Sequence, residues 1–395
     1  MTKIVFAAAA ILMVTMGARQ SLGLFVSPLN TSTGLGITTI SFALAVAQLM
    51  WGVAQPVAGA VADRHGTGKV LAAGLLVLAL GMAITPFMHT GLGLVFSLGL
   101  LSAIGAGAGS FSVLIGAASR NLSPRARGKA AGVINAGASF GQFVFAPISQ
   151  ALIQSVGWMG AMWSLAAITL ASAPLVRLVS PKAALPHGVA ASDSRPWQAM
   201  REAMGDRSYL LLHAGFFTCG FHIAFLVTHL PGEVNLCSLP PSVASTSLAL
   251  IGLSNIVGSL LAGASTARFR SKYILALMYG SRAALIGLYL LAPKTQATFY
   301  VFAVGLGLTW LATVPPTAAI VGKLFGVRYL ATLFGLTLLS HQVGAFFGAY
   351  LGGIALARTG SYEWMWYADM ALASMAALVN LPIREARVEP AAVPA

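Results

Sequence analysis

The sequence predicts an all-α membrane protein with twelve transmembrane helices arranged as two pseudo-symmetric six-helix bundles. Of its 395 residues, 57% are hydrophobic and only 8% are charged, whereas soluble domains carry roughly 25% charged residues. The apolar runs are long and unbroken, unlike the short alternating strands of a membrane β-barrel. The second half also repeats features of the first half at a constant spacing, which divides the chain into two equivalent bundles.

Twelve apolar runs have the length of about 20 residues that a spanning helix needs. In the first half they lie at 4–28, 39–61, 70–88, 92–117, 130–154 and 158–178. In the second half they lie at 208–231, 242–264, 272–291, 297–320, 329–356 and 363–383. The first run follows Lys3 and contains Gly17-Ala18, as a signal peptide would. Because it has a counterpart in the second half, we expect it to be the first transmembrane helix.

The repeat has a spacing of 203 residues, at which Lys69 aligns with Lys272. Other aligned pairs are Arg19 with His222, Gly141 with Gly344, Gly157 with Gly360, and Trp163 with Trp366. The predicted domains are an N-terminal bundle at 1–178 and a C-terminal bundle at 207–384. A cytoplasmic linker at 179–206 joins them, and a cytoplasmic tail follows at 385–395.

The formal net charge of +14 is mainly a signal of membrane topology. Lys and Arg concentrate at the termini and in the even-numbered connections, while the opposite connections hold only Lys294 and Arg358. By the positive-inside rule, both termini are predicted to be cytoplasmic. Basic residues distributed in this way do not indicate a nucleic-acid partner.

The connection between the second and third runs, GAVADRHGTGK at 59–69, resembles the loop signature of the major facilitator superfamily. The second copy, GASTARFRSK, keeps the glycine and the basic residues but has Ala267 where Asp63 stands. The resemblance implies a two-domain transporter with alternating access in a bacterial inner (plasma) membrane. It also implies that helices 1, 4, 7 and 10 line a central cavity. The gating motif then consists of Gly59, Asp63, Arg64, Lys69 and Arg268.

Ionisable residues inside a membrane indicate functional sites, because their insertion is costly. Arg19 lies about 15 residues, or about 22 Å, into helix 1, and the repeat places His222 at the same depth on helix 7. Both are predicted to bind substrate; the alternatives are snorkelling for the arginine and a hydrogen bond to a neighbouring helix for the histidine. His341 on helix 11 aligns with Ala138, so the repeat does not require it and a binding role is favoured. His222 and His341 are also candidates for proton coupling.

Arg282 on helix 9 and Asp369 on helix 12 are predicted to form a structural ion pair, because their depths match on neighbouring helices. The alternative is that Arg282 turns inward and adds a second charge to the cavity. The glycines at 344, 348 and 352 suit close helix packing. Further candidates for the cavity lining are polar or aromatic: Gln20, Asn135, Gln142, Asn255, Trp310 and Gln342.

A cavity with cationic and titratable groups but no free carboxylate should attract an anion. The planar fork of an arginine matches a carboxylate, and the apolar neighbours favour a monocarboxylate or a small dicarboxylate carried with a proton. Arg19 and the segment SHQVGAFFGAYLGG make the chain similar to the monocarboxylate and oxalate/formate branch of the superfamily. Eukaryotic members of that branch have an Asp and an Arg where this sequence has Asn255 and Ser259.

Other functions are open at this point. A proton-coupled drug exporter usually has an embedded acidic residue in the N-terminal half and a Gly-Pro motif on helix 5, and neither is present. A sugar or nucleoside carrier would show more amides and carboxylates, and a non-transporting membrane sensor would keep the fold alone. Metal-ligand spacing, a nucleophile motif and a phosphate loop are absent, so we expect neither an enzyme nor a cofactor. The expected partners are a small organic anion, protons and the lipid bilayer, with the protein a monomer.

Overall fold

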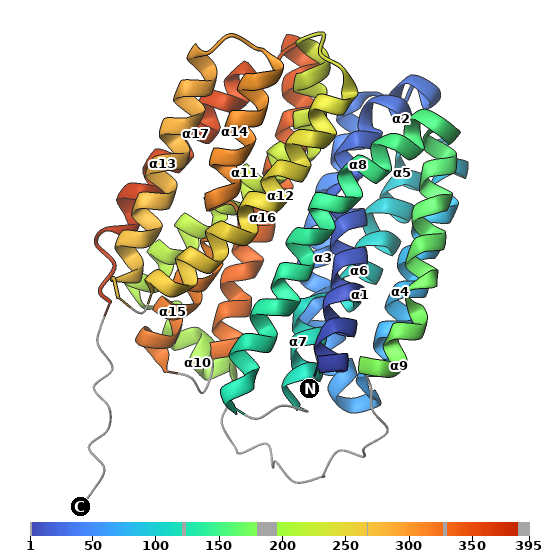
Figure 1. Ribbon diagram of the computed structural model, residues 1–395. Helices are drawn as coiled ribbons and strands as arrows, with labels where there is room; N and C mark the ends of the chain where they lie inside the picture. Colours follow the sequence, from blue (N-terminus) through green and yellow to red (C-terminus); the bar gives the residue numbers. More distant parts are fainter. Residues whose placement is uncertain (1, 121–123, 180–195, 267, 327–329, 386–395) are drawn as a thin grey trace, which may run out of the picture.

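Two bundles of helices lie side by side in the computed structural model (Figure 1), which describes residues 2–120, 124–179, 196–266, 268–326 and 330–385. The linker predicted at 179–206 and the tail predicted at 385–395 fall largely outside these residues. Within them every regular element is a helix, and nine helical stretches are long and apolar enough to cross a membrane.

The first bundle is built from α1 to α9. Its longer elements are α1 (Thr2–Gln20), α2 (Val26–Thr33), α3 (Ile37–His65), α4 (Thr67–Ile84), α7 (Phe111–Arg120) and α8 (Pro124–Ala171). Shorter elements are α5 (Gly91–Leu94), the π-helix Val95–Ser102, α6 (Ala103–Ala108) and α9 (Val176–Val179).

The second bundle follows α10 (Pro196–Ala203). It contains α11 (Arg207–Leu236), α12 (Pro241–Ser265), α13 (Ser271–Leu291), α14 (Gln296–Thr309), α15 (Val314–Phe325), α16 (Leu330–Thr359) and α17 (Glu363–Asn380).

The nine stretches become ten when α8 is divided at Gly157, and α16 and α17, which are not among the nine, supply the other two of the twelve predicted spans. α8 runs through two predicted spans, but Gly157 within it has φ 74°, a conformation that turns the chain and that glycine adopts without steric cost. Its repeat partner Gly360 has φ 68° and separates α16 from α17. The same turn therefore lies between helices 5 and 6 and between helices 11 and 12, as the repeat predicts.

Helix 10 is interrupted inside the bundle. α14 ends at Thr309 and α15 begins at Val314, with Pro315 and Pro316 at the start of α15. Proline lacks the N–H that an uninterrupted helix requires, so these two prolines account for the break at this point. The four residues between the two helices expose backbone groups to the rest of the bundle.

The predicted glycine face of helix 11 is in contact with helix 7. A Cβ atom built on Gly344 or Gly348 would lie 2.0 or 2.1 Å from a carbonyl oxygen of α11, and one built on Gly220 would lie 1.7 Å from the carbonyl oxygen of His341. These distances permit glycine alone, so the prediction of close packing is confirmed. This contact fixes the rotation of the two helices and therefore determines which of their residues face the cavity.

The bundles contact each other mainly through α3 with α16 and α8 with α12. The start of α1 and the end of α17 lie toward the same end of the molecule, the lower end in Figure 1, which we call the terminal end; the opposite end is the far end. At the far end the Phe42 ring packs 5.2 Å from the Tyr350 ring, and the Thr38 hydroxyl donates to the carbonyl oxygen of Gly353 at 3.4 Å. These contacts join the two bundles at the far end.

Candidate functional site

A cavity of about 670 Å³ lies between the two bundles. Residues from α1, α3 and α8 form one wall, and residues from α11, α12, α15 and α16 form the other. Its lining reaches Gly132 near the start of α8, Gly263 near the end of α12 and Phe334 near the start of α16. These ends of the three helices lie at the terminal end (Figure 1). The cavity therefore extends toward the terminal end, while aromatic contacts close the far end.

Arg19 enters this cavity from the last turn of α1. Its guanidinium donates a hydrogen bond to the side-chain oxygen of Gln48 and lies 4.2 Å from the centre of the Trp51 ring. A cation over the face of an indole is stabilised electrostatically. Two neutral partners thus hold the arginine in place, and its positive charge stays uncompensated because no carboxylate belongs to the described cavity lining.

One face of α3 supplies partners that the sequence analysis missed. Gln48, Trp51 and Gln55 all line the cavity, and their spacing of three and four residues puts them on one side of the helix. The spacing of polar and aromatic residues within an apolar run indicates such a cavity-facing side in the sequence. A search for charged residues alone does not find these three residues.

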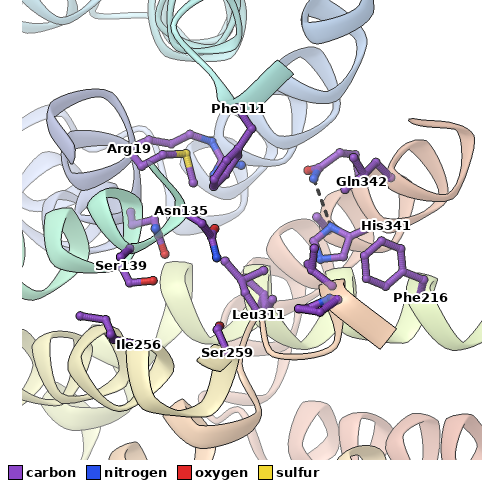
Figure 2. Close-up of a pocket in the computed structure, with 18 of the residues that line it drawn as sticks. Arg19, Phe111, Asn135, Ser139, Phe216, Ile256, Ser259, Leu311, His341 and Gln342 are labelled. Carbon is purple, nitrogen blue, oxygen red and sulfur yellow. Dashed lines mark hydrogen bonds between the residues drawn. The ribbon is translucent and has the colours of Figure 1, made fainter. Parts of the chain in front are cut away.

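The opposite wall carries His341 and Gln342 of α16 (Figure 2). The Gln342 amide nitrogen lies 3.1 Å from His341 Nδ1. His341 Nε2 and Gln342 Oε1 are buried and have no hydrogen-bond partner in the described structure. Phe216 packs 4.9 Å from the histidine ring. One donor or acceptor on each side chain is thus free for a ligand.

Two other predicted residues, Gln20 and Asn135, also line the cavity, together with Ser139 and Ser259. Asn255 lies just behind this lining. Its Nδ2 donates to the Ser139 hydroxyl at 3.0 Å, and its Oδ1 accepts from the backbone N–H of Leu311 at 3.0 Å. It therefore joins α12 to α8 of the other bundle and to the break in helix 10. Gln142 is buried nearby and is not part of the lining.

The structure corrects the predicted pairing of Asp369. Asp369 Oδ2 lies 2.5 Å from Nδ1 of His222, and both side chains are fully buried. Arg282 instead donates to the carbonyl oxygens of Thr309 at 2.6 Å and Trp310 at 3.2 Å. The physical reason is that the break in helix 10 leaves these carbonyls without helical donors, while Asp369 faces α11.

This pairing also removes His222 from the cavity. The His222 ring packs against Trp310, with ring centres 5.8 Å apart, and neither residue lines the cavity. The expected convergence of Arg19 and His222 on one ligand is therefore not present in this structure. Of the predicted binding residues, those at the cavity are Arg19, Gln20, Asn135, His341 and Gln342.

The predicted gating motif lies at the terminal end, where α3 gives way to α4. Gly59 and Lys69 are in the described structure, and Lys69 and Arg268 are exposed. The side chains of Asp63 and Arg64 lie outside the described part of the chain. Their role in gating stays a prediction.

A family model described as Major Facilitator Superfamily matches residues 8–349. The chain belongs to the Major Facilitator Superfamily. It is therefore a multi-pass membrane transporter and not an enzyme, as the motif at 59–69 predicted.

Proteins similar in sequence to this major facilitator are named as transporters. Monocarboxylate transporter 13 of Rattus norvegicus is 28% identical over 338 residues, which is 83% of this chain and 76% of the relative. The uncharacterized MFS-type transporter YcxA of Bacillus subtilis is 23% identical and covers 92% of this chain, with 90% of its own length matched. The resemblance to the monocarboxylate branch is confirmed at this level. Among solved structures, a D-xylose-proton symporter has the same fold, with a TM-score of 0.77, 13% identity, and coverage of 97% of this chain and 98% of the symporter.

Proposed function

We propose that this major facilitator carries a small organic anion, a monocarboxylate or small dicarboxylate, across a bacterial inner membrane in symport with protons. The observation that carries the proposal is Arg19, a cation in the cavity with no carboxylate beside it in the described lining. An uncompensated charge in a low-dielectric site is costly. An anionic ligand relieves that cost and binds through the guanidinium fork.

The partners of Arg19 support this role. Gln48 accepts from one guanidinium nitrogen and Trp51 covers one face, so the side chain is held before a ligand arrives. A preorganised group loses less conformational entropy on binding. Neither partner neutralises the charge, which leaves it available for the carboxylate.

The rest of the cavity favours a ligand with an apolar body. Phe111, Phe216, Ile223 and Leu311 contribute to its walls, and burial of apolar surface stabilises a bound ligand by about 25 cal/mol per Å². A polyanion would find a single fixed cation there among the described residues. The names of the monocarboxylate transporter relatives point to the same class of ligand.

The charge pattern of the sequence supports the orientation. If the terminal end is cytoplasmic, the cavity extends toward the cytoplasm and the far end is the closed, outer side. Alternating access then requires the contacts of α3 with α16 to separate at the far end while the terminal end closes.

Thermal-shift measurements on the purified full-length protein test the anion. Acetate, lactate, benzoate and malonate are compared with benzamide, a neutral analogue of benzoate. A ligand at 100 times its Kd stabilises a protein by about 2.7 kcal/mol. We expect at least one acid, and not benzamide, to raise the unfolding temperature.

Variants assign the effect to the arginine. Arg19→Ala should weaken acid binding about tenfold or more, because a hydrogen bond to a charged group contributes about 1.5–3 kcal/mol. Gln48→Leu should weaken it less, and Gln150→Leu, at a buried glutamine of α8 outside the cavity lining, is the control. The proposal fails if no acid stabilises the wild type or if Arg19→Ala binds the acid equally well.

A further inference from the structure

Behind the cavity wall, the second bundle encloses a cluster of charged side chains that does not contact the cavity. His222 comes from α11, Asp369 from α17 and Arg282 from α13, and all three are fully buried. Ile223, which follows His222 in the sequence, and Leu311, which follows the Trp310 carbonyl bound by Arg282, both line the cavity. The cluster is thus one layer of side chains away from the proposed ligand.

The geometry of the pair defines where protons lie. His222 Nδ1 and Asp369 Oδ2 are 2.5 Å apart, a separation that requires a hydrogen between the two atoms. With a neutral imidazole, Nδ1–H donates to the ionised carboxylate. His222 Nε2 is buried and has no partner in the described structure. This nitrogen carries the lone pair that an added proton would occupy.

Arg282 connects the pair to the cavity wall. One guanidinium nitrogen donates to the carbonyl oxygens of Thr309, the last residue of α14, and Trp310, the first residue of the break in helix 10. Its Nε and Nη1 are buried without partners in the described structure, and Trp310, whose carbonyl oxygen it binds, packs its ring 5.8 Å from the His222 ring. Across the break, Leu311 and Pro315 belong to the cavity lining. A change of charge at His222 therefore acts, through Arg282, on the backbone that shapes the cavity.

The surroundings leave few competing groups. The charged and titratable side chains around the pair and Arg282 in the described structure are Tyr279 of α13 beneath the Arg282 guanidinium, Cys219 of α11 beside the Trp310 carbonyl, and His341 of α16 on the cavity side. From α12 and from the start of α15 the neighbours are the uncharged Asn255 and Thr313. Asp369 is thus the one carboxylate of this set.

We propose that the His222–Asp369 pair is the proton-binding site of the transport cycle, and that Arg282 couples its charge to the break in helix 10. The proton binds to His222 Nε2, which converts the neutral imidazole to an imidazolium paired with Asp369. His222 and Arg282 then both carry a positive charge. Because these charges repel each other, the hydrogen bonds from Arg282 to the carbonyl oxygens of Thr309 and Trp310 change. This inference deepens the proposed function and rests on it for the coupled anion, while proton binding itself needs no anion.

Nuclear magnetic resonance of the full-length protein with ring-labelled histidine tests proton binding directly. Among the seven histidines, the His222 signal is identified by its loss in His222→Gln. We expect that signal to move from the neutral toward the protonated position as the pH falls from about 8 to about 4 in the wild type. In Asp369→Asn, which keeps the acceptor but not the charge, the signal should stay at the neutral position over this range.

The matched control is His229→Gln. His229 is buried on the same helix, but its Nε2 lies 2.6 Å from a backbone carbonyl oxygen, that of Ala349, and not from a carboxylate. This variant should leave the His222 titration unchanged. A His222 signal that does not respond to pH in the wild type, or that responds equally in Asp369→Asn, overturns the proposal.

Transport in proteoliposomes tests the coupling, with [14C]benzoate as the probe. Asp369→Asn should keep the rate of benzoate counterflow within about threefold of the wild type, since exchange does not require net proton movement. Its accumulation of benzoate driven by a proton gradient should fall by about tenfold or more. Accumulation equal to the wild type would overturn the coupling. Absence of counterflow in the wild type, or counterflow unaffected by Arg19→Ala, would instead count against the anion proposal, and the histidine titration would still decide the proton site.

Discussion

At the scale of single residues, the partner of Asp369 depends on helix rotation. A rise of 1.5 Å per residue fixes how deep a side chain lies, and the depths of Arg282 and Asp369 matched well enough to predict a pair. The direction in which each side chain points around its helix is set by packing, which the sequence alone does not give. Asp369 faces His222 on α11, and Arg282 finds carbonyls that only the broken helix 10 exposes.

The environment of Glu385 can be tested by varying the pH. Its carboxylate follows α17 and accepts from the backbone N–H groups of Ser271 at 3.0 Å and Lys272 at 3.2 Å, at the start of α13. It also accepts from the Lys323 ammonium. Partial burial by itself raises the pKa of this carboxyl, but the hydrogen bonds from Lys323 and the two amides outweigh burial and leave the pKa lowered.

A lowered folded-state pKa means that the carboxylate stabilises the fold above its unfolded pKa of about 4.3. This stability is lost as the pH falls through the folded-state pKa. We expect Glu385→Gln to lower stability by about 1 kcal/mol at neutral pH, allowing for solvent screening. The difference from the wild type should disappear at about pH 3. The difference is measured as unfolding temperatures in detergent between these pH values, and Glu363→Gln, at an exposed carboxylate, is the control. A difference that persists at the low pH contradicts the stabilising role of the Glu385 carboxylate.

At the scale of helices, most of the fold could be predicted because a bilayer dictates helix length. The twelve apolar runs correspond to helices, and Gly157 and Gly360 end matched helices in both halves. What could not be predicted is which helix face meets the cavity. Gln48 and Gln55 were missed, while Asn255 was assigned to the lining and instead joins two bundles behind it.

The contact of α11 with α16 depends on glycine. A Cβ on Gly344 would meet the Phe217 carbonyl oxygen at 2.0 Å, whereas one on Gly335, in the same helix, would meet nothing within 4 Å. Overpacking costs about 1–3 kcal/mol, so Gly344→Ala should lower the unfolding temperature and Gly335→Ala should not. Equal unfolding temperatures for the two variants would contradict the close packing of these helices.

At the scale of the whole molecule, the two bundles enclose a cavity that extends toward the terminal end. The far end is closed by α3 against α16, where Ser41 and the small residues Ala45, Ala345 and Ala349 are buried. Under the proposed function we expect this contact to open and re-form, because the ligand must reach Arg19 from both sides. The contact would then serve both the structure and the transport cycle.

Gly353 is the position at which this closure can be disturbed. A Cβ atom there would lie 2.4 Å from Cβ of Ser41 and 3.3 Å from the carbonyl oxygen of Ile37, so a larger residue separates α3 from α16. We expect Gly353→Val to favour the state that is open at the far end. The reporter is Ala45→Cys, fully buried beneath the contact, in a Cys237→Ser background, labelled with a membrane-impermeant maleimide from the far side.

Labelling at position 45 should increase about tenfold in Gly353→Val, because a shift of about 1.4 kcal/mol in a two-state equilibrium changes the minor population by that factor. Gly335→Val, on the same helix and with open space around it, should leave labelling at the wild-type level. The unfolding temperature of Gly353→Val is the control for folding. If it equals that of the wild type while labelling rises, the contact between α3 and α16 acts on the equilibrium between the closed and open states and not on folding. If labelling stays low in Gly353→Val, the contact is not the barrier on the far side, and alternating access would have to use another opening.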